Sequence, residues 1–151
     1  MKLRLFIAIN LPEDLKNKIN QELTEILSLF HFPIRFLKPE NWHLTLSFLS
    51  YQPQEGINEI LAGIKKTAAE FNAPFINLEK IDYGPEDASA KSLPARMIWL
   101  NCSRETSEHL AIIKKTLEDN LVQADIRFKR ENRPFHAHLT LARFEPQLRR
   151  N

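Results

Sequence analysis

The chain has 151 residues, of which 43% are hydrophobic and 26% are charged. This length and composition are typical of one globular domain, and they exclude disordered and fibrous proteins. The 21 Lys and Arg residues exceed the 19 Asp and Glu residues by only two, so no overall positive field is available to grip a long nucleic acid. Any anion-binding site must therefore be local.

Cysteine content and the N-terminus favour a cytoplasmic protein. Cys102 is the only cysteine, which excludes an internal disulfide and favours a reduced compartment with a buried thiol. The apolar run over residues 5–9 follows two basic residues, as in a signal peptide, but it is short and meets Pro12 without a cleavage site. No stretch approaches the ~20 apolar residues that cross a bilayer. We therefore expect an N-terminal strand, a cytoplasmic location and no membrane partner.

The beginning of the chain predicts a strand over residues 3–9 followed by a helix. Pro12 suits the first turn of that helix, and Pro33 is expected to end it. Lys16 is assigned to its polar face. The apolar face consists of residues at helical spacing, namely Leu15, Ile19, Leu23, Ile26, Leu27 and Phe30.

An extended segment over 35–37 and a strand over 42–49 come next. Alternation in the strand places four apolar residues toward the core: Trp42, Leu44, Leu46 and Phe48. A second helix is predicted over 57–71, and a strand over 75–81. The buried face of this helix is expected to contain Ile60, Leu61, Ile64 and Ala68.

The remaining elements repeat this order. A loop over 83–94 leads to a strand over 96–101, and Ser103 is expected to cap a third helix. That helix carries an apolar stripe of Leu110, Ile113, Leu117 and Leu121. Strands over 126–129 and 135–144 complete the pattern.

The tetrapeptide His-Leu-Thr-Leu occurs twice, at 43–46 and at 138–141. Residues two apart in a strand project from one face, so each copy presents a histidine beside a threonine. Two opposed pairs suit a phosphodiester, because one imidazole can act as base and the other as acid, while threonine hydroxyls donate to the phosphate oxygens. A single copy would indicate only a half-buried strand, but the repetition favours chemistry.

These sequences resemble a known family. "LRLFIAINLP", "RFLKPENWHLTLSFL", "ARMIWL" and "HAHLTLARF" are similar to the two-histidine phosphoesterase superfamily, in particular to the RNA 2′,3′-cyclic phosphodiesterases long called 2′-5′ RNA ligases. The resemblance covers nearly the whole chain. It implies an α+β fold, bilobal and pseudo-symmetric, in which antiparallel sheets line a central cleft and helices pack outside. We expect one such domain over residues 1–151, shortened at the C-terminus relative to the family.

The resemblance also implies the activity and its residues. RNA ends carrying a 2′,3′-cyclic phosphate would be opened to a 2′-phosphate without metal or cofactor, with reversible 2′-5′ RNA ligation as an accompanying activity. His43 would be the proton donor and His138 the proton acceptor that activates water, although the symmetry of the two copies leaves the opposite assignment open. Thr45, Thr140 and Arg143 would bind phosphate. We expect a monomer.

Several alternatives stay open. Arg143 lies five residues after His138 and would face away from it in an unbroken strand, unless a bulge or the strand end brings it back. His136 and His138 are also spaced like two zinc ligands, without an evident third. A binding module for nucleotides or RNA that has kept the cleft is the alternative to an enzyme. The basic residues near the motifs could line the path of a phosphate backbone or simply be solvated: Arg35, Lys38, Lys129, Arg130 and Arg133.

Overall fold

The computed structural model describes residues 1–29, 34–85 and 96–144, which form a fold of α-helices and antiparallel β-strands. This confirms the expected fold class at that level. The chain divides into two compact units, each assembled from three stretches. The first unit contains Met1–Ile9, Thr45–Leu78 and Cys102–Ala137, and the second contains Asn10–Leu44, Glu79–Asn101 and His138–Asn151. The pseudo-symmetry and the central cleft stay predictions.

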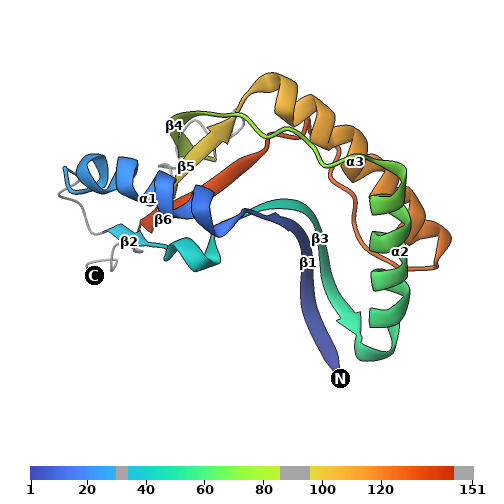
Figure 1. The fold of residues 1–151 in the computed structure, drawn as a ribbon. Helices are drawn as coiled ribbons and strands as arrows, with labels where there is room; N and C mark the ends of the chain where they lie inside the picture. Colours follow the sequence, from blue (N-terminus) through green and yellow to red (C-terminus); the bar gives the residue numbers. More distant parts are fainter. Residues whose placement is uncertain (30–33, 86–95, 145–151) are drawn as a thin grey trace. The chain divides into compact units, whose positions relative to one another are not determined.

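The first unit combines two helices with a strand pair. β1 (Lys2–Asn10) pairs with β3 (His43–Pro53), whose first two residues belong to the second unit. The short helix η2 (Gln54–Gly56) leads from β3 into α2 (Ile57–Glu70), which lies beside α3 (Arg104–Gln123) (Figure 1).

The packing of α2 against α3 is close at Gly63. A Cβ there would lie 2.8 Å from Leu121 Cδ2, so only glycine fits without displacing that side chain. The predicted stripe of α3 is buried throughout, at Leu110, Ile113, Leu117 and Leu121. Ser103 caps α3 as expected, because its side chain accepts from the Thr106 N–H at 3.2 Å.

The second unit contains α1 (Glu13–Leu27), β2 (Ile34–Phe36), η1 (Pro39–Asn41) and the beginning of β3. It also contains nearly all of β4 (Leu78–Gly84) and β5 (Met97–Cys102), and the described residues of β6 (His138–Phe144). β6 pairs antiparallel with β5 along one edge, and with β3 and β2 along the other. β4, β5 and β6 lie side by side (Figure 1). The motif strand β6 is therefore the central strand of this unit.

Helix faces differ from the prediction at several positions. Lys16, assigned to the polar face of α1, is 1% exposed, while Ile26 is 45% exposed. The buried Lys16 ammonium donates to the Glu40 carbonyl at 3.4 Å and pairs with the Glu13 carboxylate at 3.6 Å, so its charge has two partners. In α2 the buried residues are Ile60, Gly63 and Thr67, and Leu61 is half exposed. Phe30 lies outside the described residues.

Strand limits differ as well. β4 begins three residues later than predicted, and Phe75 is 86% exposed. Residues 126–129 form no strand. The side-chain amide of Gln52 donates to the Arg127 carbonyl at 2.9 Å, so a side chain replaces the ladder partner that a strand would need. β6 begins at His138 rather than at residue 135, and most of the predicted loop over 83–94 lies outside the described residues.

Candidate active site

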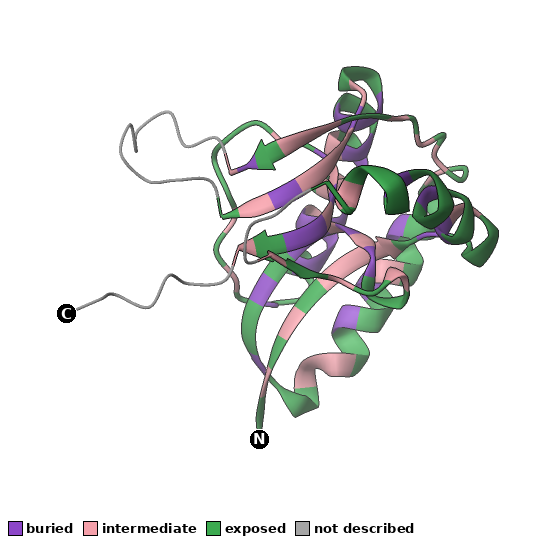
Figure 2. Ribbon diagram, turned by 90° about the vertical axis from the view of Figure 1, so that its left-hand side faces the viewer, coloured by how far each residue is buried: buried purple, intermediate pink, exposed green. Residues whose placement is uncertain are grey.

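The two copies of His-Leu-Thr-Leu lie on β3 and β6 and have the same burial pattern. In each copy both leucines are buried, and the histidine and threonine are partly exposed. Leu44 and Leu139 are opposite each other in the antiparallel pair, and both are fully buried. In Figure 2, buried (purple), intermediate (pink) and exposed (green) residues follow one another along the strands. The predicted division of each motif into a polar and an apolar face is confirmed.

This register brings the two histidines to one face of the second unit. Since Leu44 and Leu139 share the buried face, His43 and His138 both project from the opposite one. The same register aligns His43 with Thr140, which makes His138 a diagonal neighbour of His43, roughly 7 Å away by ordinary sheet geometry. Thr45 is the first residue of β3 in the first unit, and its relation to the other site residues stays a prediction.

A bulge in β6 decides the direction of Arg143. Ile98 of β5 is opposite Ala142, but the next residue, Trp99, is opposite Thr140. Leu141 is therefore an extra residue, and alternation shifts by one position beyond it. Because directly opposed residues share a face, Arg143 projects from the face of Thr140 and His138. Of the two alternatives that the sequence left open, the structure has the bulge, which returns Arg143 to the face of His138.

His43 is oriented by the chain that precedes it. Its Nδ1 lies 2.8 Å from the Asn41 carbonyl oxygen. A carbonyl only accepts, so Nδ1 is assigned the hydrogen and Nε2 is the nitrogen left for proton transfer. Asn41 ends η1, where the Trp42 N–H donates to the Pro39 carbonyl at 3.0 Å. The turn thus fixes the ring of His43.

His138 is oriented by an aromatic ring. Its imidazole stacks on the indole of Trp99, with 3.7 Å between ring centroids and 18° between planes. Gly84 packs against the same indole, and a Cβ at Gly84 would overlap the ring. Sequence reasoning missed Trp99. The available signal was alternation in the predicted strand over 96–101, which places Trp99 on the same face as Asn101. Asn101 is directly opposite His138.

Arg35 is a second residue that sequence reasoning did not assign to the site. It lies on β2, directly opposite Arg143 of β6, and both side chains are exposed. Opposed residues of neighbouring strands share a face. Arg35 therefore belongs to the same face as His138 and Thr140.

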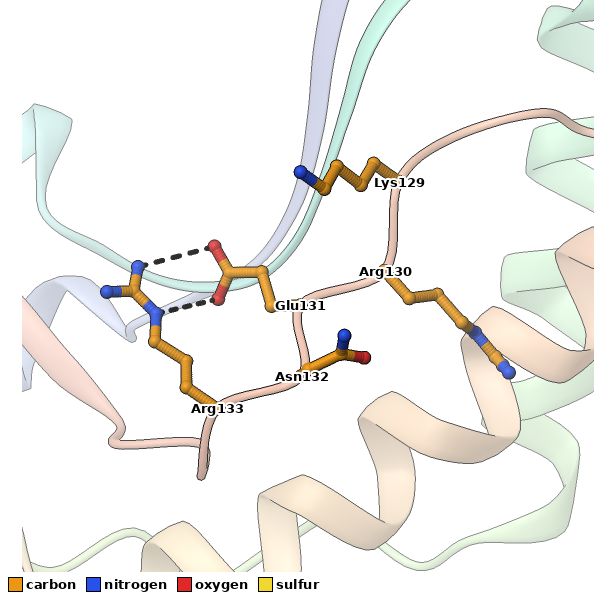
Figure 3. Close-up of a pocket in the computed structure, with 5 residues that line it drawn as sticks. All are labelled: Lys129, Arg130, Glu131, Asn132 and Arg133. Carbon is orange, nitrogen blue, oxygen red and sulfur yellow. Dashed lines mark hydrogen bonds and ion pairs between the residues drawn. The ribbon is translucent and has the colours of Figure 1, made fainter.

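The other candidates lie elsewhere or have other partners. Residues 129–133 line a pocket of about 500 Å³ in the first unit. There Arg133 pairs with Glu131 at 3.4 Å, and Arg130 extends away from that pair (Figure 3). Arg130 forms ion pairs with Glu118 and Asp119. The positive charges of this pocket are thus largely balanced by neighbouring carboxylates.

Histidine and cysteine positions bear on the zinc alternative. His136 precedes β6, is exposed and belongs to the first unit. In the described ranges, no group of three or more His, Cys, Asp or Glu side chains is placed to hold a metal ion. Cys102 is buried as expected, and burial raises the pKa of its thiol to about 11.

Comparison with known proteins decides the family. The family described as "LigT like Phosphoesterase" matches residues 9–93, more than half of the chain. The chain belongs to this phosphoesterase family. The resemblance to the two-histidine phosphoesterases is confirmed, and so is the expectation of an enzyme.

Individual relatives agree. A Thermus thermophilus protein named RNA 2′,3′-cyclic phosphodiesterase is 28% identical over 148 residues, covering 93% of this chain and 68% of its own length. A protein of the same name from Escherichia coli is 29% identical over 143 residues, with coverages of 93% and 71%. The crystal structure of E. coli LigT complexed with 3′-AMP superimposes with a TM-score of 0.67 at 26% identity, covering 95% of this chain and 74% of that one.

Within the described part of this LigT-like chain, no helix combines the length and the apolar character that a membrane crossing requires.

Proposed function

We propose that this protein is an RNA 2′,3′-cyclic phosphodiesterase that opens the cyclic phosphate at an RNA 3′ end to a 2′-phosphate. The observation that carries the proposal is the common face of His43 and His138 on adjacent strands of the second unit. Ring opening needs an acid at the departing oxygen and a base at the attacking water, and imidazoles suit both near neutral pH. The relatives named RNA 2′,3′-cyclic phosphodiesterase support RNA 2′,3′-cyclic phosphates as the substrate class.

The residues have separate roles in this proposal. His43 donates a proton to the departing 3′ oxygen, and His138 accepts a proton from the attacking water. Thr45, Thr140 and Arg143 hold the phosphate oxygens, where hydrogen-bond donors stabilise the charge that develops in the transition state. The common face of Arg143 and Thr140 beyond the bulge supports this assignment.

The Nδ1 hydrogen bond of His43 supports its role in proton transfer. With Nδ1 engaged by the Asn41 carbonyl, the imidazole is held in one orientation and exchanges protons through Nε2. This arrangement serves either an acid or a base, so the direction of transfer rests on the family resemblance. No metal or cofactor takes part in the proposed reaction, and the protein acts as a monomer in the cytoplasm. Attack by the 5′-hydroxyl of a second RNA in place of water, with the 3′ oxygen again departing, would account for 2′-5′ ligation of RNA ends, and this step is reversible.

The decisive experiment is incubation with a nucleoside 2′,3′-cyclic phosphate and with an RNA oligonucleotide ending in the same group. We expect a 2′-phosphate product, resolved from the 3′ isomer by chromatography, and turnover that survives excess EDTA. Loss with EDTA and recovery with zinc would contradict the metal-free mechanism. Binding without turnover at any pH would replace the enzyme by a binding module.

The ligase activity needs a separate assay. An RNA with a 5′-hydroxyl is mixed with one ending in a 2′,3′-cyclic phosphate, and the joined product is tested for resistance to an enzyme specific for 3′-5′ links. A 2′-5′ product that His43→Ala no longer forms would support ligation at the same site. Absence of joined product at high RNA concentration would remove ligation from the proposal.

A further inference from the structure

Two positive charges oppose each other on the face that carries the motif residues. Arg35 of β2 and Arg143 of β6 are direct antiparallel partners, so their Cβ atoms lie about 4.5 to 5.5 Å apart by sheet geometry. Both side chains are exposed. Among the residues that the structure describes, neither has an ion pair with a carboxylate.

Like charges directly opposite in a sheet are destabilising. Two guanidinium groups present ten N–H donors in planar forks that match phosphate oxygens. An anion between them removes the repulsion and forms charge-assisted hydrogen bonds with both. The pair therefore has the chemistry of a phosphate subsite.

Arg143 lies between the reacting centre and Arg35. Arg143 follows His138 by five residues, one of which is the extra residue of the bulge. Four rises of a strand amount to roughly 13 Å between the Cα atoms of His138 and Arg143. Thr140 is only two rises from Arg143, roughly 7 Å between Cα atoms, so a phosphate held at Thr140 lies near the Arg143 side chain. Arg35 lies one strand further to the side.

We propose that Arg35 and Arg143 bind the phosphodiester on the 5′ side of the terminal nucleotide, so that the enzyme selects oligonucleotide ends over free cyclic nucleotides. This inference rests on the proposed function and adds a substrate preference to it. Arg143 contacts both the reacting phosphate and the next one, whereas Arg35 contacts only the second. Arg35 is thus a specificity residue and not a catalytic one.

The test compares a nucleoside 2′,3′-cyclic phosphate with a dinucleotide ending in the same group. We expect wild-type kcat/KM to be higher for the dinucleotide. Arg35→Met should lower kcat/KM for the dinucleotide about tenfold through KM and leave the nucleotide unchanged, because a charge-assisted contact is lost only in the longer substrate. Arg143→Met should lower both. Equal loss on both substrates with Arg35→Met, or no loss on either, would overturn the proposal.

Controls separate the local contact from general electrostatics and folding. Arg4→Met removes one exposed strand arginine from the first unit and should change neither substrate. Arg35→Lys should keep part of the preference for the dinucleotide, because lysine supplies a point charge without the planar fork of arginine. The slope of log KM against log salt for the dinucleotide should fall by about 0.7 with Arg35→Met, the value for one phosphate contact in a single strand. An unchanged slope would overturn the proposal.

Binding provides a readout that does not require turnover. Calorimetry of the folded protein with the dinucleotide and with the nucleoside, each bearing a 2′-phosphate, should show about tenfold weaker dinucleotide binding in Arg35→Met. If the protein cleaves neither cyclic substrate, the proposed function fails, and this titration still decides the subsite. Equal affinity of wild type and Arg35→Met for the dinucleotide would overturn the subsite.

Discussion

The two copies of His-Leu-Thr-Leu are alike along the strand and different in their surroundings. After the threonine, both strands bury two consecutive residues, Leu46 and Ser47 in β3 and Leu141 and Ala142 in β6. The next residue is exposed in each, and it is Phe48 in the first copy and Arg143 in the second. Only the second copy therefore adds a cation to its strand.

The buried pair of the first copy serves the core. Ser47 Oγ donates to the Glu118 carboxylate at 2.8 Å, and Lys114 Nζ donates to the Leu46 carbonyl at 2.8 Å. This inward Ser47 is the physical reason why Phe48, predicted to face the core, is 60% exposed. Phe48 lies near Phe6 instead, with 6.2 Å between ring centroids.

The histidines differ in what holds them. A main-chain carbonyl engages His43, whereas the indole of Trp99 supports His138. Identical tetrapeptides thus place two imidazoles in different environments. The following predictions test how far the copies are equivalent.

Replacing either histidine should have the largest effect. His43→Ala and His138→Ala should each lower kcat/KM by about 10² to 10⁴, because each removes one partner in proton transfer. The double variant should cost far less than the product of the two losses, since the groups act as a unit. The wild-type pH profile should be bell-shaped and belong to the coupled pair. Near-full activity in a folded single variant would contradict the catalytic interpretation of the repeat.

Replacing the threonines tests the phosphate contacts of each copy. Thr45→Val and Thr140→Val should lower kcat by about 10² to 10³, the usual loss when one transition-state donor is removed. The pH profile should keep its position and lose height, because these hydroxyls do not transfer the titrating protons. Thr24→Val on the exposed surface of α1 is the matched control. A loss confined to Thr140→Val would show that only the second copy holds the phosphate.

Replacing Trp99 tests the support that is specific to the second copy. Trp99→Leu should lower kcat by about two- to tenfold, as expected for the loss of one aromatic stacking interaction. Trp99→Phe keeps an aromatic ring and should lower kcat less. NMR should show the ring protons of His138 shifted upfield in the wild type by the indole and moved in Trp99→Leu. The ring protons of His43 serve as the internal reference. Unmoved His138 resonances would contradict the stacking role.

Cys102 gives the smallest expected effect on turnover. Its N–H donates to the carbonyl of Ala137, the residue before the second copy, at 2.9 Å. Cys102→Ala should leave kcat/KM unchanged, because the thiol lies outside the reacting face. Burial raises the thiol pKa from 9.0 to about 11, so native alkylation at pH 8 should be roughly a hundredfold slower than in urea.

The same pKa shift predicts a stability effect. The folded-state pKa lies above the unfolded value, so the contribution of the neutral thiol is complete below pH 9 and is lost as the pH rises toward about 11. Unfolding in urea at several alkaline pH values measures this, with Cys102→Ala as the reference. Equal pH dependence of the two proteins would contradict it.

Features with local signals were predictable from the sequence. The stripe of α3 and its Ser103 cap depend on residues within one helix, and the two faces of each motif depend on period-two alternation within one strand. The repeat singled out the two histidines, and the family resemblance supplied their catalytic roles, which stay predictions.

Features that depend on distant partners were not predictable. Arg143 changes face because β5 and β6 pair with an offset, and Arg35 meets Arg143 through strand pairing across more than 100 residues. The absent strand over 126–129 depends on the side chain of Gln52. Burial of Lys16 likewise depends on a carbonyl in η1. Periodicity carries no information on any of these interactions.

The bulge at Leu141 divides β6 into two phases of alternation. Up to Thr140 the even-numbered residues occupy the polar face, and beyond Leu141 the odd-numbered residues do. Replacing Leu141 by another apolar residue keeps these phases, and deleting it would restore unbroken alternation with Arg143 four residues after His138, still on the polar face. The bulge therefore compensates for the odd spacing of His138 and Arg143, and an engineered or diverged version of the strand keeps Arg143 on this face either with the extra residue and a bulge or with neither.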